Sequence, residues 1–112
     1  MLSACSFQNK YEKEADKITR AVIANNVQDV KGDFDSKVAE QMTHARVGAL
    51  SDELDDQGKY EGLKEVQTAD CPAGAHCFDA KFEKHDYHET LSMDDQGKVT
   101  VWRIHMAVPA AQ

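Results

Sequence analysis

The chain has 112 residues, of which 41% are hydrophobic and 29% are charged, and its formal net charge is -7 at pH 7. This length suits one domain that buries about two-thirds of its unfolded surface in a modest two-layer core. Thirteen basic and twenty acidic side chains provide no basic stripe for phosphates, so we expect no nucleic-acid partner. No apolar run approaches the roughly 20 residues that cross a bilayer.

The first five residues contain a pattern that is typical of bacterial lipoproteins. Leu2-Ser3-Ala4-Cys5 resembles a lipobox, in which a leucine and two small residues precede the lipid-bearing cysteine. The basic and apolar segments of a signal peptide are missing upstream. One interpretation makes residues 1–5 the remnant of such a signal and places the chain in the cell envelope or periplasm, with membrane contact only through a lipid on Cys5. The alternative is a disordered N-terminus of a cytoplasmic protein.

The other two cysteines, Cys71 and Cys77, flank a connection that contains proline and glycine. Cysteines on either side of a hairpin loop can face each other within the distance that a disulfide requires. A disulfide needs an oxidising compartment, so it agrees with the envelope interpretation. Free thiols and a metal site are the alternatives, but the spacing exceeds that of zinc motifs and only His76 lies nearby as a third ligand. We expect the disulfide, with no metal and no cofactor.

Apolar residues recur at spacings of three and four from Phe7 to Val22, which indicates one face of an α-helix. We expect this long helix to span residues 6–30. Asp35 or Ser36 is expected to cap a short second helix.

The rest of the chain has the pattern of a very short third helix, capped by Ser51, and four strands. The runs rich in β-branched and aromatic residues are separated by turn signals, of which Asp95-Gln96-Gly97 is the clearest. The predicted strands are residues 60–68, 77–83, 87–93 and 98–107. Sequential strands with short connections predict an antiparallel meander and an α+β fold. We expect one domain, residues 6–107, and a disordered tail, residues 108–112.

Three segments after the first helix, KGDFDSKVAEQM, LSDELDDQGKYEGLKEV and FEKHDYHETLSMDDQGKV, resemble the nuclear-transport-factor-two-like, or cystatin-like, superfamily. The small bacterial members of unknown function are the most similar. The resemblance covers about residues 10–106 and rests on patterns rather than on signature residues. It implies a long helix wrapped by a curved four-stranded sheet into a cone, frequent dimerisation through the sheet, and sometimes a pocket between them. It does not imply an activity, because this fold hosts enzymes, binding proteins and scaffolds.

Glu89 and Tyr87 are the candidate catalytic residues. Enzymes of the resembled superfamily place acidic, tyrosine or histidine side chains inside the cone. By alternation, Tyr87 and Glu89 share one face of the third strand. If this face points inward, desolvation raises the pKa of Glu89 toward the range of a general base, and Tyr87 is placed to donate to an oxyanion. If Glu89 lies near the sheet edge instead, it is solvated.

The histidines are interpreted as surface or edge residues. His85 and His88 point to opposite faces of a strand, and His44 and His105 have no companions at ligand spacing. They therefore give no reason to predict a metal site.

The fourth strand is apolar on both faces. By strict alternation, Val99 and Val101 point to one side, while Trp102 and Ile104 point to the other. The helix can cover only one side, so either a bulge near Val101 resets the alternation or a second subunit covers the outer face. We favour a symmetric homodimer with Val99, Val101, Trp102 and Ile104 at its interface.

These observations lead to two functional hypotheses. The first is a non-catalytic cell-envelope domain that binds a small apolar ligand or a protein partner. The alternative is a small isomerase- or dehydratase-like enzyme that uses the interior of the cone. A sealed interior favours the first hypothesis, and an open one with paired polar groups favours the second.

Overall fold

Helices come first along the chain and strands second in the computed structural model, which describes residues 9–107. The predicted α+β class and the antiparallel meander are confirmed. The predictions for residues 1–5, including the lipid on Cys5, and for residues 108–112 lie outside the described residues. No helix within the described range has the length and apolar character needed to cross a membrane.

Helix α1 spans Lys10–Ile23 and is shorter than the predicted helix over residues 6–30. At its start, the side chain of Asn9 accepts a hydrogen bond from the backbone N–H of Glu12 at 2.8 Å. This is an N-cap, which satisfies one of the free donors of the first turn. The prediction of an earlier start was wrong because apolar periodicity does not register such a cap.

The end of α1 is set by Asn25, which has a positive φ of 56°. The backbone N–H of Asn26 donates to the carbonyl of Ala21 at 2.8 Å and closes the last turn. After glycine, asparagine is the residue that most often adopts this left-handed conformation at a helix end. Residues 27–33 instead form two single turns of 3-10 helix, Val27–Asp29 and Lys31–Asp33.

The two later helices match the prediction to different degrees. Helix α2, Ser36–Gln41, is capped by the side chain of Asp35, as expected. Helix α3, His44–Asp55, begins after Thr43 and is much longer than the predicted short helix. Ser51 lies inside α3 and does not cap it. Its hydroxyl donates to the carbonyl of Ile23 at 3.0 Å and thereby ties α3 to the end of α1.

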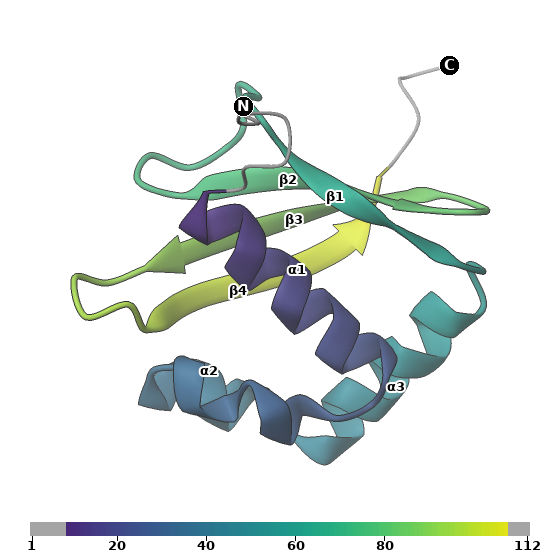
Figure 1. Ribbon diagram of the computed structural model, residues 1–112, viewed down its shortest axis with the longest axis horizontal. Coiled ribbons are helices and arrows are strands. Elements are labelled where there is room, and N and C mark those ends of the chain that lie inside the picture. The colour runs from purple at the N-terminus through teal and green to yellow at the C-terminus, as the bar shows by residue number, and fades with distance from the viewer. Residues whose placement is uncertain (1–8, 108–112) are drawn as a thin grey trace, which may run out of the picture.

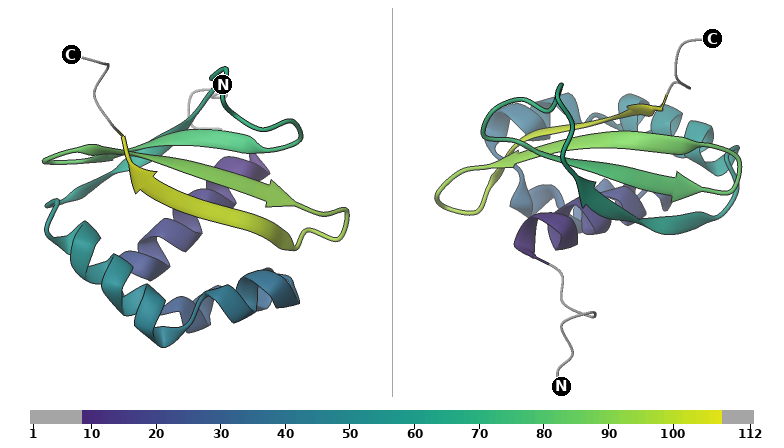
Figure 2. Two further views of the ribbon diagram at one scale, coloured as in Figure 1. Left: turned by 180° about the vertical axis from the view of Figure 1, so that it is seen from behind. Right: turned by 90° about the horizontal axis from the view of Figure 1, so that it is seen from above.

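The strands are β1 (Tyr60–Val66), β2 (His76–Phe82), β3 (Asp86–Met93) and β4 (Val99–Met106), paired in the order β1-β2-β3-β4. All three helices lie on the same side of the sheet (Figures 1 and 2). We call the covered side the inner face and the other side the outer face. With α1 at 14 residues, the long helix implied by the family resemblance is not confirmed, and neither is the cone.

The core lies between the helices and the inner face. It is formed by alternate strand residues and by the apolar stripes of the helices. Its largest members with almost no exposed surface are Ile18, Leu54, Phe78, Tyr87 and Leu91. Among the described residues, the buried polar side chains are Thr19, Ser51 and Glu89.

A β-bulge interrupts the pairing of β3 with β4. Val101 pairs with Ser92 and Val99 pairs with Met93, which leaves Thr100 as an extra residue on β4. The extra residue resets the alternation of side chains. The bulge that the sequence analysis offered as one alternative is therefore present.

The bulge changes the predicted dimer interface. Val99 and Trp102 both face inward, with exposed fractions of 0% and 4%, because the bulge lies between them. They are covered by their own chain and cannot contact a second subunit, so this part of the predicted interface was wrong. Val101 and Ile104 are half-buried, and Ile104 packs on the core. The homodimer itself stays a prediction.

Candidate functional site

Polar side chains gather at two places on the sheet. One place is on the inner face around Glu89, and the other is on the outer face beneath the loop of residues 67–75, which joins β1 to β2. The two places share β3, whose alternate side chains point to opposite faces.

Glu89 is fully buried between α1 and the sheet, with an exposed fraction of 0%. Its Oε2 lies 2.6 Å from Oγ1 of Thr19 on α1, and its Oε1 accepts a hydrogen bond from Nε1 of Trp102 at 3.1 Å. Burial raises the pKa of Glu89 to about 8, although the hydrogen bonds with Thr19 and Trp102 lower it, and the negative charge of Asp16 acts in the same direction as burial. Glu89 therefore faces inward and is not solvated at a sheet edge.

Tyr87 is also buried, and its hydroxyl donates to Oε2 of Glu53 on α3 at 2.8 Å. Burial and then this hydrogen bond raise the pKa of Tyr87. The two candidate catalytic residues thus have separate internal partners. Because the carboxyl of Glu89 has no exposed surface, a substrate cannot reach it in this arrangement.

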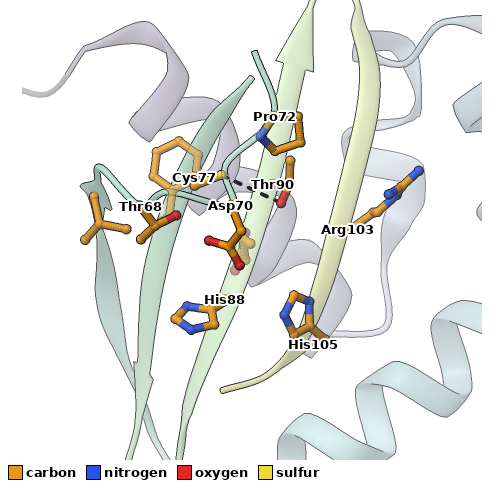
Figure 3. Close-up of a pocket in the computed structure, with 11 residues that line it drawn as sticks. Thr68, Asp70, Pro72, Cys77, His88, Thr90, Arg103 and His105 are labelled. Carbon is orange, nitrogen blue, oxygen red and sulfur yellow. Dashed lines mark hydrogen bonds between the residues drawn. The ribbon is translucent and has the colours of Figure 1, made fainter. Parts of the chain in front are cut away.

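The outer face carries a cavity of about 250 Å³ between the 67–75 loop and strands β3 and β4 (Figure 3). Phe78 and Glu89 border it, although their side chains are buried on the inner face. Six polar residues from three segments line it with exposed or partly exposed side chains. They are Thr68 and Asp70 of the loop, His88 and Thr90 of β3, and Arg103 and His105 of β4.

Antiparallel register brings the basic side chains of this cavity together. His88 pairs directly with His105, and Thr90 pairs directly with Arg103. The ring centroids of the two histidines are 5.7 Å apart. On the other side, Nδ1 of His88 lies 2.8 Å from Oδ1 of Asp79 on β2. The His88 ring therefore lies between Asp79 and His105 at the base of the cavity.

A disulfide between Cys71 and Cys77 joins the 67–75 loop to β2, with the two Cα atoms 6.0 Å apart. It holds the loop over the outer face. In Figure 3, Asp70 points toward His88 and His105. A hydrogen bond from the side chain of Thr68 lowers the pKa of Asp70, and the nearby imidazoles add to this effect.

The cavity offers both hydrogen-bond donors and an acceptor. Asp70 lies with the imidazoles of His88 and His105, whereas Arg103 points away from these three residues in Figure 3. Within residues 9–107, no three histidine, cysteine or acidic side chains are arranged to hold a metal ion. The chemistry available here is hydrogen bonding and ion pairing.

The pairing of His88 with His105 was missed from the sequence because the two residues are far apart along the chain. The sequence does contain a signal for it. His-x-Thr at residues 88–90 and Arg-x-His at 103–105 place polar residues at alternate positions of two strands that are otherwise rich in apolar residues. Folding these strands about the turn at residues 95–97 brings the two patterns side by side. The bulge at Thr100 then fixes which residues pair.

Comparisons with models of known protein families, with curated proteins and with solved structures found no match. The family resemblance therefore stays a prediction.

Proposed function

We propose that this chain is a non-catalytic binding domain of the bacterial cell envelope, which holds a small polar ligand in the outer-face cavity. One observation carries the proposal: polar side chains from the 67–75 loop, β3 and β4 line an accessible cavity, while the candidate catalytic carboxyl of Glu89 is sealed in the core. A cavity with a few converging polar groups is the usual form of a small-molecule site.

The lining defines the class of ligand. Arg103 and the imidazoles of His88 and His105 are hydrogen-bond donors and suit a carboxylate or phosphate. Asp70, which lies beside the two imidazoles, suits a hydroxyl or ammonium group. The ligand is therefore a small acid with a second polar group, such as a hydroxy acid or an amino acid. A purely apolar ligand, as expected from the sequence, leaves these groups unpaired and is less well supported.

The location in the envelope is part of this proposal. A disulfide between Cys71 and Cys77 persists in oxidising compartments and is rare in the cytoplasm. The lipobox-like pattern that ends at Cys5 points to the same location. In an envelope protein, the bond also keeps the wall of the cavity in place.

The alternative, an isomerase- or dehydratase-like enzyme, requires a substrate beside Glu89. The hydrogen bonds of Glu89 to Thr19 and Trp102, and of Tyr87 to Glu53, leave neither residue free for a reacting group. We therefore rank this alternative below the binding domain.

Two-dimensional NMR spectra of the full chain test the proposal, with small hydroxy acids, amino acids and sugar acids added at millimolar concentration. We expect the signals of His88, Thr90 and His105 to shift with at least one class. The variant His105→Ala should then weaken binding about tenfold, as loss of one hydrogen bond to the ligand does. His44→Ala is the matched control, because His44 is an exposed histidine at the start of α3. Shifts confined to the helices, or no shifts with any class, would contradict the proposal.

A further inference from the structure

The short contacts of Thr19 require more protons than its hydroxyl carries. Oγ1 of Thr19 lies 2.8 Å from the carbonyl oxygen of Ala15 and 2.6 Å from Oε2 of Glu89. A hydroxyl has one proton, and both neighbours are pure acceptors when Glu89 is ionised. An ionised Glu89 therefore leaves one of these two oxygen–oxygen contacts without a proton.

A proton on Glu89 satisfies every atom of this cluster. The carboxyl then donates from Oε2 to Thr19, and Thr19 donates to the carbonyl of Ala15 one turn earlier in α1. Oε1 still accepts from Nε1 of Trp102 at 3.1 Å. The separation of 2.6 Å is typical of an O–H···O hydrogen bond.

We propose that Glu89 is a neutral carboxylic acid that latches α1 to β3 and β4 at neutral pH, and that loss of its proton at mildly alkaline pH weakens this latch. Ionisation turns the Thr19 hydroxyl from Ala15 toward Glu89, so the contact between the two side chains remains, but it leaves an unpaired negative charge in the core, which costs free energy. Since β3 also carries His88 and Thr90, the latched strand is part of the wall of the outer-face cavity.

Burial and the charge of Asp16 favour the neutral form of Glu89, whereas the hydrogen bonds that Thr19 and Trp102 offer to its ionised form act in the opposite direction. On α1, Asp16 is negatively charged, and it is shared between Nε of Arg20 at 2.9 Å and the hydroxyl of Tyr60 on β1 at 2.6 Å. None of the salt bridges within residues 9–107 includes Glu89. The directly paired neighbours on β2 and β4 are apolar, namely Phe78 and Ile104. Tyr87, the other titratable residue on this face of β3, donates its hydrogen bond to Glu53 and not to Glu89.

The fluorescence of Trp102 tests the latch, because this is the single tryptophan of the chain and it donates directly to Glu89. We expect the emission of the folded full-length protein to change in one step between about pH 6 and about pH 10, with its midpoint above 7. In Glu89→Gln the step should disappear. In the control Glu14→Gln it should remain, because Glu14 also has a raised pKa, of about 7, but has no bond to Trp102. Absence of the step in wild type, or its persistence in Glu89→Gln, overturns the proposal.

A second measurement covers the case in which Glu89→Gln does not fold. Carbon-13 NMR of the glutamate carboxyl carbons in Glu14→Gln should show one glutamate that titrates with a midpoint above 7. If every glutamate in that folded variant titrates below about pH 6, Glu89 is ionised at neutral pH and the proposal fails.

Discussion

The inner and outer faces of the sheet are made by the same four strands but differ in what their side chains do. On β3, Tyr87, Glu89 and Leu91 are buried against the helices, while His88 and Thr90 line a cavity that is open on the other side. The inner face therefore forms the core, and the outer face carries the accessible cavity. Substitutions on the two faces of one strand should separate these properties, because adjacent strand residues point in opposite directions.

The largest expected effect comes from Glu89 and depends on pH. The pKa of Glu89 is about 8 in the folded chain against an ordinary value of 4.5, so the folded state binds this proton more tightly than the unfolded state. The associated stability is fully present below pH 4.5 and is lost as the pH rises through about 8. The free energy of unfolding should fall by up to about 5 kcal/mol over this interval. Urea unfolding at a series of pH values measures it.

In the variant Glu89→Gln, the free energy of unfolding should depend much less on pH. In the outer-face variant His105→Ala, the dependence on pH should be the same as in wild type. Glu14 adds a smaller slope of the same sign, because partial burial and then the neighbouring Asp33 raise its pKa to about 7. A wild-type protein whose stability rises between pH 4.5 and 8 would contradict the assignment.

The next effect compares two residues of β2 that point to opposite faces. Phe78 is fully buried, so Phe78→Ala should lower the free energy of unfolding by about 3 to 4 kcal/mol through lost burial and a residual cavity. Lys81 is exposed on the outer face. Lys81→Ala should therefore change the free energy of unfolding by less than about 0.5 kcal/mol. Urea unfolding at fixed pH compares the two. Equal effects would mean that the faces do not differ as described.

The disulfide gives an intermediate effect and links stability to the cavity. Replacing Cys71 and Cys77 together by serine should cost about 2 kcal/mol, because the bond closes a short loop. The same change should weaken ligand binding on the outer face, since the 67–75 loop forms one wall. Cys5→Ser is the control. In the unfolded, unreduced protein, thiol titration should find one reactive group, that of Cys5, and a count of three would exclude the bond.

The smallest effect on folding concerns the predicted homodimer. With Val99 and Trp102 buried, a dimer through the sheet has to use outer-face residues such as Val101. Val101→Asp should dissociate such a dimer, seen as a drop to monomer mass in sedimentation at tens of micromolar. The free energy of unfolding of the monomer should change by about 0.5 kcal/mol or less. Wild-type protein that already sediments as a monomer rules this dimer out.

Local sequence determined most of the elements. The cap at Asp35, the four strands within one or two residues and the turn after Asp94 all depend on neighbours a few positions apart, whose preferences a short window contains. The end of α1 at Asn25 is also a local signal, since asparagine tolerates positive φ. The predicted helix ran past it because the apolar periodicity continues beyond this residue.

Tertiary structure alone decided the features of the candidate site. The alternation of β3 put Glu89 and Tyr87 on one face, but only the packing of α1 made that face the buried one. The bulge at Thr100 reversed the expected orientation of side chains along part of β4. The register of β3 and β4 then placed His88 beside His105. These outcomes depend on which strand pairs with which and on which face the helices cover. Such contacts between distant residues are chosen by total burial and hydrogen bonding, which no local pattern contains.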